Sequence, residues 1–503
     1  METVIIPNGS LAEVACYNEQ VIKDYRNNPL IEALPPLQSP DTVIGKLAYY
    51  PEYDPNERNL ESYYRIHIIN RLFEVFQPLP MTVELESRIS RILRQGYISR
   101  NPFGSQLASG FREGYRLLHN PNMPINGVSN QSAYGFTLIG TSGLGKTSSL
   151  NRILSLYPQV IAHSEYKGIP LSAYQIVWIK LECPHDSSIK GLLFEFFSIT
   201  DRLLGTSYYK KMASTRPTAD IMLTAMNQVV RNTFCGLIII DEIQHLNAAK
   251  SGGSEKMLSF FTNLVNSVGV PIILVGTPKA ISIVQAEFRQ ARRGSSGLGG
   301  DMICDRMEND RAWELLVRTL WHYQWTRKNT LLTQELIDVL YDETQGIPDL
   351  LKKVYGIAQA QAIATGKEEI MPALIRKVAK ENLKLVQPMI AALKTGDVRK
   401  IAKYQDIYIP DVDLESFVIK TRQPVILDYE PKAAPNPLLP EKKKEEEKIK
   451  NEKSKEVVKE DPLDIRVIVE RGKAQNMSAY EALLAAGYIK TFKNDIFSVG
   501  WYV

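Results

Sequence analysis

The sequence predicts an α/β protein built on a parallel sheet, and three features indicate this fold class. Apolar strand-like runs alternate with helical segments between residues 126 and 300, which is typical of a parallel sheet covered on both faces. One run leads directly into a glycine-rich loop and a helix, and another ends in two adjacent carboxylates. The carboxyl ends of parallel strands meet at one edge, so these features predict a phosphate site there.

Four strands are expected in this core. The helices between them should begin near Lys146, Ser187 and Ser254, where helical periodicity follows a turn or a capping residue. The expected strands cover residues 134–139, 175–181, 236–240 and 271–275.

Pattern and composition divide the chain into five parts. The first is a mostly helical, partner-docking region with proline breaks and an amphipathic helix over 81–95. The third is a helical lid and extension without a clear strand, and the fourth is a linker ending in a charged run. That run cannot bury a core, so it is a solvated helix or a disordered tether. The last is a small partner-binding segment. In chain order, the docking region covers residues 1–125, the α/β core 126–300, the lid and extension 301–410, the linker with its charged run 411–461, and the partner-binding segment 462–503.

Bulk composition excludes several classes of protein. The net charge is only +4, with 23% charged residues, so a nucleic-acid site must be a local patch. The four cysteines (Cys16, Cys183, Cys235 and Cys304) have no metal-type or redox spacing, and no structural metal is expected. Without a visible signal peptide or a long apolar run, a soluble, cytoplasmic protein is expected.

The glycine-rich loop reads GTSGLGKT and matches the phosphate-loop pattern G-x-x-x-x-G-K-[ST]. Its glycines let backbone N–H groups surround phosphate oxygens, and the helix that follows adds positive potential. Lys146 is expected to neutralise the β- and γ-phosphates of ATP, and the Thr147 hydroxyl to bind Mg²⁺. A glycine-rich turn without a ligand is the alternative. The expected nucleotide-binding residues are Gly140, Thr141, Ser142, Gly143, Leu144, Gly145, Lys146, Thr147, Ser148 and Asp241.

Polar residues also end the next two apolar runs. In LIIIDE, Asp241 is expected to hold Mg²⁺ together with Thr147, and Glu242 to polarise the attacking water. A solvated acidic turn is the alternative. In PIILVGTP, the hydroxyl of Thr277 could bond the attacking water or the γ-phosphate, or the residue could simply form a turn.

An arginine cluster follows in FRQARR, which contains Arg289, Arg292 and Arg293. One of them could reach the γ-phosphate of a neighbouring subunit and thereby couple hydrolysis to assembly. The alternative is that they cover a solvated helix end or pair with Glu287. The sequence does not choose between these arrangements.

The order of phosphate loop, paired acids, threonine strand end, arginine cluster and helical lid resembles that of AAA+ P-loop ATPases. Within that class the chain resembles the TnsC family, the target-selection regulators of Tn-seven-type transposons, which are related to TniB and MuB. The resemblance covers most of residues 25–410. It is carried by the segments NPLIEALPPL, SRILRQGYISRNP, SIKGLLFEFFSITDRLLGTSYY, QGIPDLLKKVYGIAQ and AALKTGDVRKIAKYQDI.

The resemblance implies a bacterial, nucleoid-associated ATPase that uses ATP and Mg²⁺. Such a protein would form a ring or filament on double-stranded DNA and link a target-site selector protein to transposase subunits. ATP hydrolysis would discharge the oligomer. Residues at matching positions are Lys146, Thr147, Asp241, Glu242 and Thr277. A helicase or clamp-loader-type motor is the alternative function, and a signalling NTPase without DNA is a third.

Two features of the lid bear on this resemblance. Many AAA+ lids place a phosphate-sensing arginine where this chain has Asp349. Lys352 and Lys353 could substitute from the next helical turn. Tryptophans 313, 321 and 325 recur on one side of a helix, which predicts core packing rather than base stacking.

Cations and aromatic residues mix in one part of the core and form the candidate DNA contact. One lysine lies near a helix start, and the other cations share a loop with Tyr208 and Tyr209. They could neutralise DNA phosphates without reading sequence, or they could belong to a solvated surface loop. The candidates are Lys190, Lys210, Lys211 and Arg216.

Overall fold

The computed structural model describes residues 2–104, 135–184, 188–215, 217–245, 260, 270–280, 300–384 and 386–395. All of them belong to the first of the chain's two units, Met1–Leu438. Several expectations lie outside the described residues: the helix near Ser254, the linker, the C-terminal segment, and Arg216, Arg289, Arg292 and Arg293.

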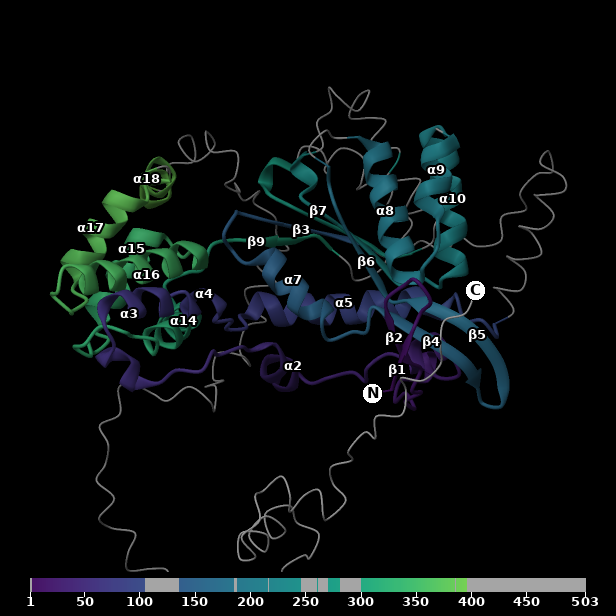
Figure 1. Ribbon diagram of the computed structural model, residues 1–503, viewed down its shortest axis with the longest axis horizontal. Helices are drawn as coiled ribbons and strands as arrows, with labels where there is room; N and C mark the ends of the chain where they lie inside the picture. Colours follow the sequence, from purple (N-terminus) through teal and green to yellow (C-terminus); the bar gives the residue numbers. More distant parts are fainter. Residues whose placement is uncertain are drawn as a thin grey trace, which may run out of the picture. The chain divides into compact units, whose positions relative to one another are not determined.

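The central sheet has five parallel strands in the order β6-β7-β8-β3-β9. Strands β6, β7, β3 and β9 are labelled in Figure 1. Every residue of β3, β7 and β8 is buried, because helices cover both faces of a parallel sheet. The strands are β3 (Phe136–Gly140), β6 (Trp178–Glu182), β7 (Leu237–Asp241), β8 (Ile272–Gly276) and β9 (Met302–Cys304). The predicted fold class is confirmed. The expectation of no strand after residue 301 is wrong, because β9 pairs with β3 at the sheet edge.

A second, four-stranded sheet has the order β1-β2-β4-β5. It contains β1 (Thr3–Ile5), β2 (Leu11–Val14), β4 (Val160–Tyr166) and β5 (Ile169–Ile176). The first residues of the chain are therefore strands, although the sequence predicted a mostly helical region. The single strand expected over 175–181 is also corrected, because β5 ends at Ile176 in one sheet and β6 starts at Trp178 in the other.

Helices from two parts of the chain cover opposite faces of the central sheet (Figure 1). On β7, Leu237 and Ile239 pack with α5 and α7, whereas Ile238 and Ile240 pack with α8 and α10. The N-terminal region thus shares the core of the sheet. The covering helices are α1 (Pro29–Glu32), α2 (Pro40–Leu47), α5 (Pro80–Ile98), α7 (Lys146–Leu154), α8 (Ile189–Leu204), α9 (Tyr208–Thr215) and α10 (Ala219–Asn232).

The amphipathic pattern over 81–95 correctly predicts α5, since Leu85, Ile89, Ile92 and Leu93 are all buried.

The prediction of a loop around Tyr208 is wrong. It forms the helix α9, whose first N–H groups, those of Tyr208 and Tyr209, donate to the Asp201 carboxylate at 2.8 and 2.7 Å.

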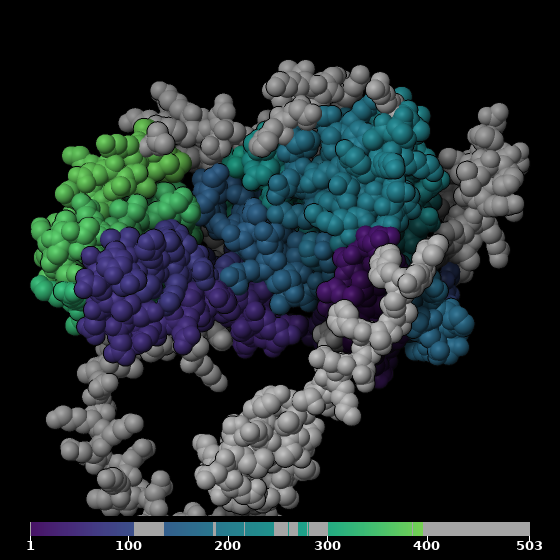
Figure 2. Space-filling view, viewed as in Figure 1, coloured from purple at the N-terminus to yellow at the C-terminus, as the bar shows by residue number. Residues whose placement is uncertain are grey.

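The lid is a helical unit, and part of the N-terminal region packs into its hydrophobic core. Its helices are α14 (Arg311–Trp321), α15 (Gln334–Thr344), α16 (Pro348–Ala364), α17 (Pro372–Asn382) and α18 (Gln387–Thr395). Helices α3 (Ser62–Ile68) and α4 (Arg71–Glu74) share the lid's hydrophobic core, and Figure 2 shows this segment against the lid. Trp313, Trp321 and Trp325 are buried in that core as predicted, although Trp325 lies beyond the end of α14.

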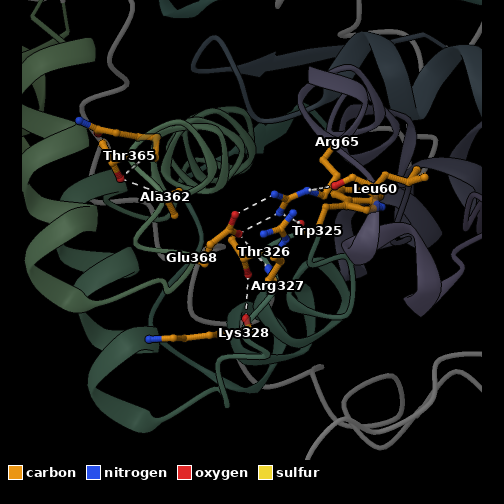
Figure 3. A network of polar contacts seen from close by, with 10 residues as sticks. Leu60, Arg65, Trp325, Thr326, Arg327, Lys328, Ala362, Thr365 and Glu368 are labelled. Carbon is orange, nitrogen blue, oxygen red and sulfur yellow. Dashed lines mark hydrogen bonds and ion pairs between the residues drawn. The ribbon is translucent and has the colours of Figure 1, made fainter. Parts of the chain in front are cut away.

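A buried ion pair fastens α3 to the lid (Figure 3). The guanidinium of Arg65, only 1% exposed, donates to both carboxylate oxygens of Glu368 at 2.8 and 2.7 Å. It also donates to the carbonyl oxygens of Leu60 and Trp325, each at 2.9 Å. The hydrogen bonds from Arg65 are the main cause that lowers the pKa of Glu368.

Short 3-10 helices complete the described structure: η1 (Lys23–Tyr25), η2 (Pro55–Asn59), η3 (Ile243–His245) and η4 (Pro278–Ala280). None of the helices in the described ranges is long and apolar enough to cross a membrane.

Cys235 and Cys304 are buried free thiols, and burial raises the pKa of both to about 12. These thiols are therefore protonated and unreactive at neutral pH.

Candidate nucleotide-binding site

The phosphate loop connects β3 to α7 at the carboxyl edge of the central sheet. Gly143 and Gly145 have φ angles of +87° and +83°, a backbone region that side chains rarely adopt. A Cβ on Gly145 would meet nothing within 4 Å, so the backbone turn rather than space requires glycine there. The turn leads into the N-terminus of α7, where the first N–H groups lack intrahelical partners and favour an anion.

Lys146 lies inside this loop and is only 9% exposed. Its ammonium donates to the carbonyl oxygens of Gly140 and Thr141 at 2.6 and 2.9 Å. The cation is thereby held at the strand end. A positive charge in this position fits the β- and γ-phosphates of a nucleotide.

Asp241 ends β7 beside the loop, and its side chain meets the hydroxyl of Thr147. The Thr147 Oγ1 atom donates to Asp241 Oδ2 at 3.2 Å, and the backbone N–H of Glu242 donates to Asp241 Oδ1 at 2.9 Å. Residue 241 is only 3% exposed. Carboxylate and hydroxyl oxygens are hard ligands that suit Mg²⁺, which binds few protein groups and keeps several waters. The two residues predicted as metal ligands therefore come together and fit that ion.

Glu242 is half-exposed and has a left-handed backbone, with φ of 59°. The Gln244 amide nitrogen donates to the Glu242 carboxylate, and the Gln244 amide oxygen accepts from the Thr277 backbone N–H at 3.1 Å. One side chain therefore links the expected water-polarising carboxylate to the next strand end. No sequence pattern indicates a role for Gln244, because a lone glutamine after an acidic pair is a common surface pattern.

Thr277 follows β8 and carries an unusual hydroxyl. The residue is 6% exposed, and its Oγ1 atom is buried without a hydrogen-bond partner in the described part of the chain. A buried polar atom of this kind costs about 1–3 kcal/mol and calls for an explanation. The position fits a hydroxyl that bonds a water or phosphate oxygen when nucleotide is bound.

The lid meets the phosphate loop at the start of α16. The backbone N–H of Asp349 donates to the Gly143 carbonyl oxygen at 3.1 Å. A Cβ on Gly143 would lie 3.0 Å from the Ile347 side chain and 3.1 Å from Asp349 Cβ, so a larger residue would force the lid to shift slightly. Lys353 forms an ion pair with the Asp349 carboxylate. This lysine places a positive charge beside the carboxylate at the start of α16.

Lys352, the other lysine expected to replace a sensing arginine, turns away from the loop. Its ammonium donates to the carbonyl oxygens of Phe73 and Val75 at 3.2 and 2.6 Å. Burial, and secondly the nearby charge of Arg152, lower its pKa to about 8. The lysine therefore ties α16 to the N-terminal segment and does not contact the phosphate loop.

Three of the candidate DNA contacts lie on α8 and α9. Lys190, Lys210 and Lys211 are exposed. Tyr209 packs edge-on against Phe194 of α8, with ring centroids 5.5 Å apart. This aromatic ring joins two helices and is only partly available to a ligand.

Similarity to known proteins agrees with this geometry. A family model described as an AAA domain matches residues 129–284, which include the phosphate loop, both acids and Thr277. The core has the AAA+ P-loop fold. No curated protein sequence matches the chain.

Three solved structures illustrate the range of weak structural similarity. The Aeropyrum pernix ORC2 protein is 16% identical with a TM-score of 0.32, covering 55% of this chain and 67% of its own. Cdc6p from Pyrobaculum aerophilum is 13% identical with a TM-score of 0.38, covering 69% and 86%. Domain III of the Thermotoga maritima replication initiation protein DnaA is 12% identical with a TM-score of 0.30, covering 56% and 94%.

Proposed function

We propose that this AAA+ protein is a transposition regulator of the TnsC type, which binds ATP with Mg²⁺ and assembles on double-stranded DNA. In this role it links a target-site selector to transposase subunits, and hydrolysis of ATP ends the assembled state. The observation that carries the ATP-dependent part is the Thr147 hydroxyl bonded to Asp241 beside the buried Lys146 ammonium.

Each residue of the site has a defined task in this proposal. Lys146 and the N–H groups at the start of α7 bind the β- and γ-phosphates. Asp241 and Thr147 hold Mg²⁺, which would neutralise phosphate charge when bound. Glu242 orients and polarises the attacking water as a general base. The Thr277 hydroxyl, which has no hydrogen-bond partner among the described residues, bonds that water or the γ-phosphate.

Support for a transposition role comes from the five sequence segments that resemble the TnsC family. Four of them correspond to described helices that frame the core and lid: α1, α5, α8 with α9, and α16. The exposed lysines on α8 and α9 supply cations that suit a DNA backbone. One arginine among Arg289, Arg292 and Arg293 would act on a neighbouring subunit, which would make hydrolysis depend on assembly.

Electron microscopy of the protein with duplex DNA and a non-hydrolysable ATP analogue tests this function. We expect closed rings or filaments around DNA with the analogue and none with ADP. Glu242→Gln should form the same assemblies with ATP itself and retain them, because it lacks the general base. Isolated monomers under all conditions would overturn the proposal. A strand-unwinding assay separates the alternative, since a helicase would displace a strand at the expense of ATP and a scaffold would not.

A further inference from the structure

Lys180 lies beside the proposed metal ligands, although no sequence pattern marks it. It belongs to β6, the strand that pairs with β7 (Figure 1). Its ammonium lies 3.1 Å from Asp241 Oδ2, the oxygen that also accepts from the Thr147 hydroxyl. The lysine side chain is only 15% exposed. The Lys180 ammonium therefore contacts the same carboxylate that, in the proposed function, binds Mg²⁺.

A second contact holds this cation in place. The Lys180 ammonium donates to Asn151 Oδ1 at 3.0 Å, and Asn151 lies on α7, one turn after Thr147. The lysine thus bridges the acidic strand end and the phosphate-loop helix. An exposed lysine side chain moves freely in water, whereas the Lys180 ammonium is held by both Asp241 and Asn151.

Two lysines place positive charge at the strand ends. The Lys180 ammonium contacts Asp241, and the Lys146 ammonium is held at the end of β3. A free Mg²⁺ ion entering this site would meet an ammonium group on its own carboxylate ligand. A magnesium triphosphate is negatively charged overall, so the same two lysines attract it.

We infer that Lys180 is a positioning residue that makes metal binding depend on nucleotide. The Lys180 ammonium competes with free Mg²⁺ for the Asp241 carboxylate. It also keeps this carboxylate oriented for the Mg²⁺ ion that binds together with the triphosphate. The inference rests on the proposed nucleotide site and adds a residue that the proposal does not use.

Manganese binding to the full-length protein, measured by electron paramagnetic resonance, tests this role with Mn²⁺ as the probe. Wild type, Lys180→Met and Lys180→Arg are titrated without nucleotide and with a non-hydrolysable ATP analogue. Lys167→Met is the matched control, because Lys167 also donates to an asparagine, Asn27, at 2.7 Å but lies away from the strand ends. Thermal melting verifies that each variant is folded.

Without nucleotide, we expect Lys180→Met to bind Mn²⁺ at least tenfold more tightly than wild type. Lys180→Arg, which keeps the positive charge, and Lys167→Met should both bind like wild type. With the analogue, the advantage of Lys180→Met should fall below threefold. A nucleotide-free affinity of Lys180→Met within twofold of wild type would overturn the inference, even if the variant melts earlier, because lower stability alone indicates a structural ion pair. Failure of wild type to bind Mn²⁺ with the analogue would instead refute the proposed nucleotide site.

Discussion

Replacing Thr277 by valine should make the nucleotide-free protein more stable and less active. Valine has nearly the shape of threonine and lacks the buried hydroxyl that has no partner in the described structure. An unsatisfied buried hydroxyl costs about 1–3 kcal/mol. At roughly 2–4 °C per kcal/mol for domains of 150–250 residues, removing it should raise the melting midpoint by a few degrees. If the hydroxyl serves the reaction, ATP hydrolysis should fall roughly tenfold to a hundredfold, the range of one general acid–base or hydrogen-bonding group.

Differential scanning fluorimetry without nucleotide and a steady-state phosphate-release assay measure the two effects. Thr319→Val is the matched control, because the Thr319 hydroxyl is buried and donates to the Leu315 carbonyl oxygen at 2.8 Å. That control should lose about 1 kcal/mol of stability and keep its hydrolysis rate. The reasoning is refuted if Thr277→Val melts below wild type or hydrolyses ATP at the wild-type rate.

Three further predictions concern the lid and the DNA surface. Arg65→Met should cost about 3–5 kcal/mol of stability, because it leaves the Glu368 carboxylate partly buried without its partner. The pKa of Glu368 is lowered in the folded state, so the pair stabilises the protein above the unfolded pKa and this contribution is lost as pH falls. The melting midpoint of Arg65→Met should therefore depend less on pH in the acid range than that of wild type. Lys352 has a folded pKa of about 8 against 10.5 for a free lysine, so the unfolded chain binds more protons between these values. The melting midpoint of wild type relative to Lys352→Met should therefore rise from pH 8 to 10.5, and a constant difference would contradict the burial argument. Replacing Lys210 and Lys211 together by alanine should reduce the slope of log affinity for duplex DNA against log salt by roughly 1.8, and an unchanged slope would place the DNA contact elsewhere.

Long apolar runs and one spaced motif predicted the centre of the molecule. Strands β3, β7 and β8 are buried on both faces, so their sequences are almost wholly apolar and easily recognised. The same property hid the boundary at Val177, because buried residues continue from β5 into β6 while the chain passes from one sheet to the other. The three-residue strand β9 is too short to show any periodicity.

Non-local contacts explain what the sequence did not reveal about the site. Lys180 and Gln244 act through partners on other strands or helices, and no local spacing encodes such pairs. Lys352 was expected near phosphate on helical spacing alone, but the carbonyl oxygens of Phe73 and Val75 hold it elsewhere. The assignment of α3 and α4 to the lid likewise depends on packing across nearly 300 residues of chain.

Sedimentation velocity of a labelled DNA duplex with wild-type protein or Lys146→Ala, in the presence of magnesium and ATP analogue, tests the central claim most directly. Occupancy of the site between the phosphate loop and the end of β7 should drive assembly, so wild type should move the duplex into large complexes only when nucleotide is present. Lys146→Ala, confirmed as folded by its melting curve, should leave the duplex sedimenting alone or with single subunits. Complexes of wild-type size with Lys146→Ala would contradict the claim that nucleotide at this site controls assembly on DNA.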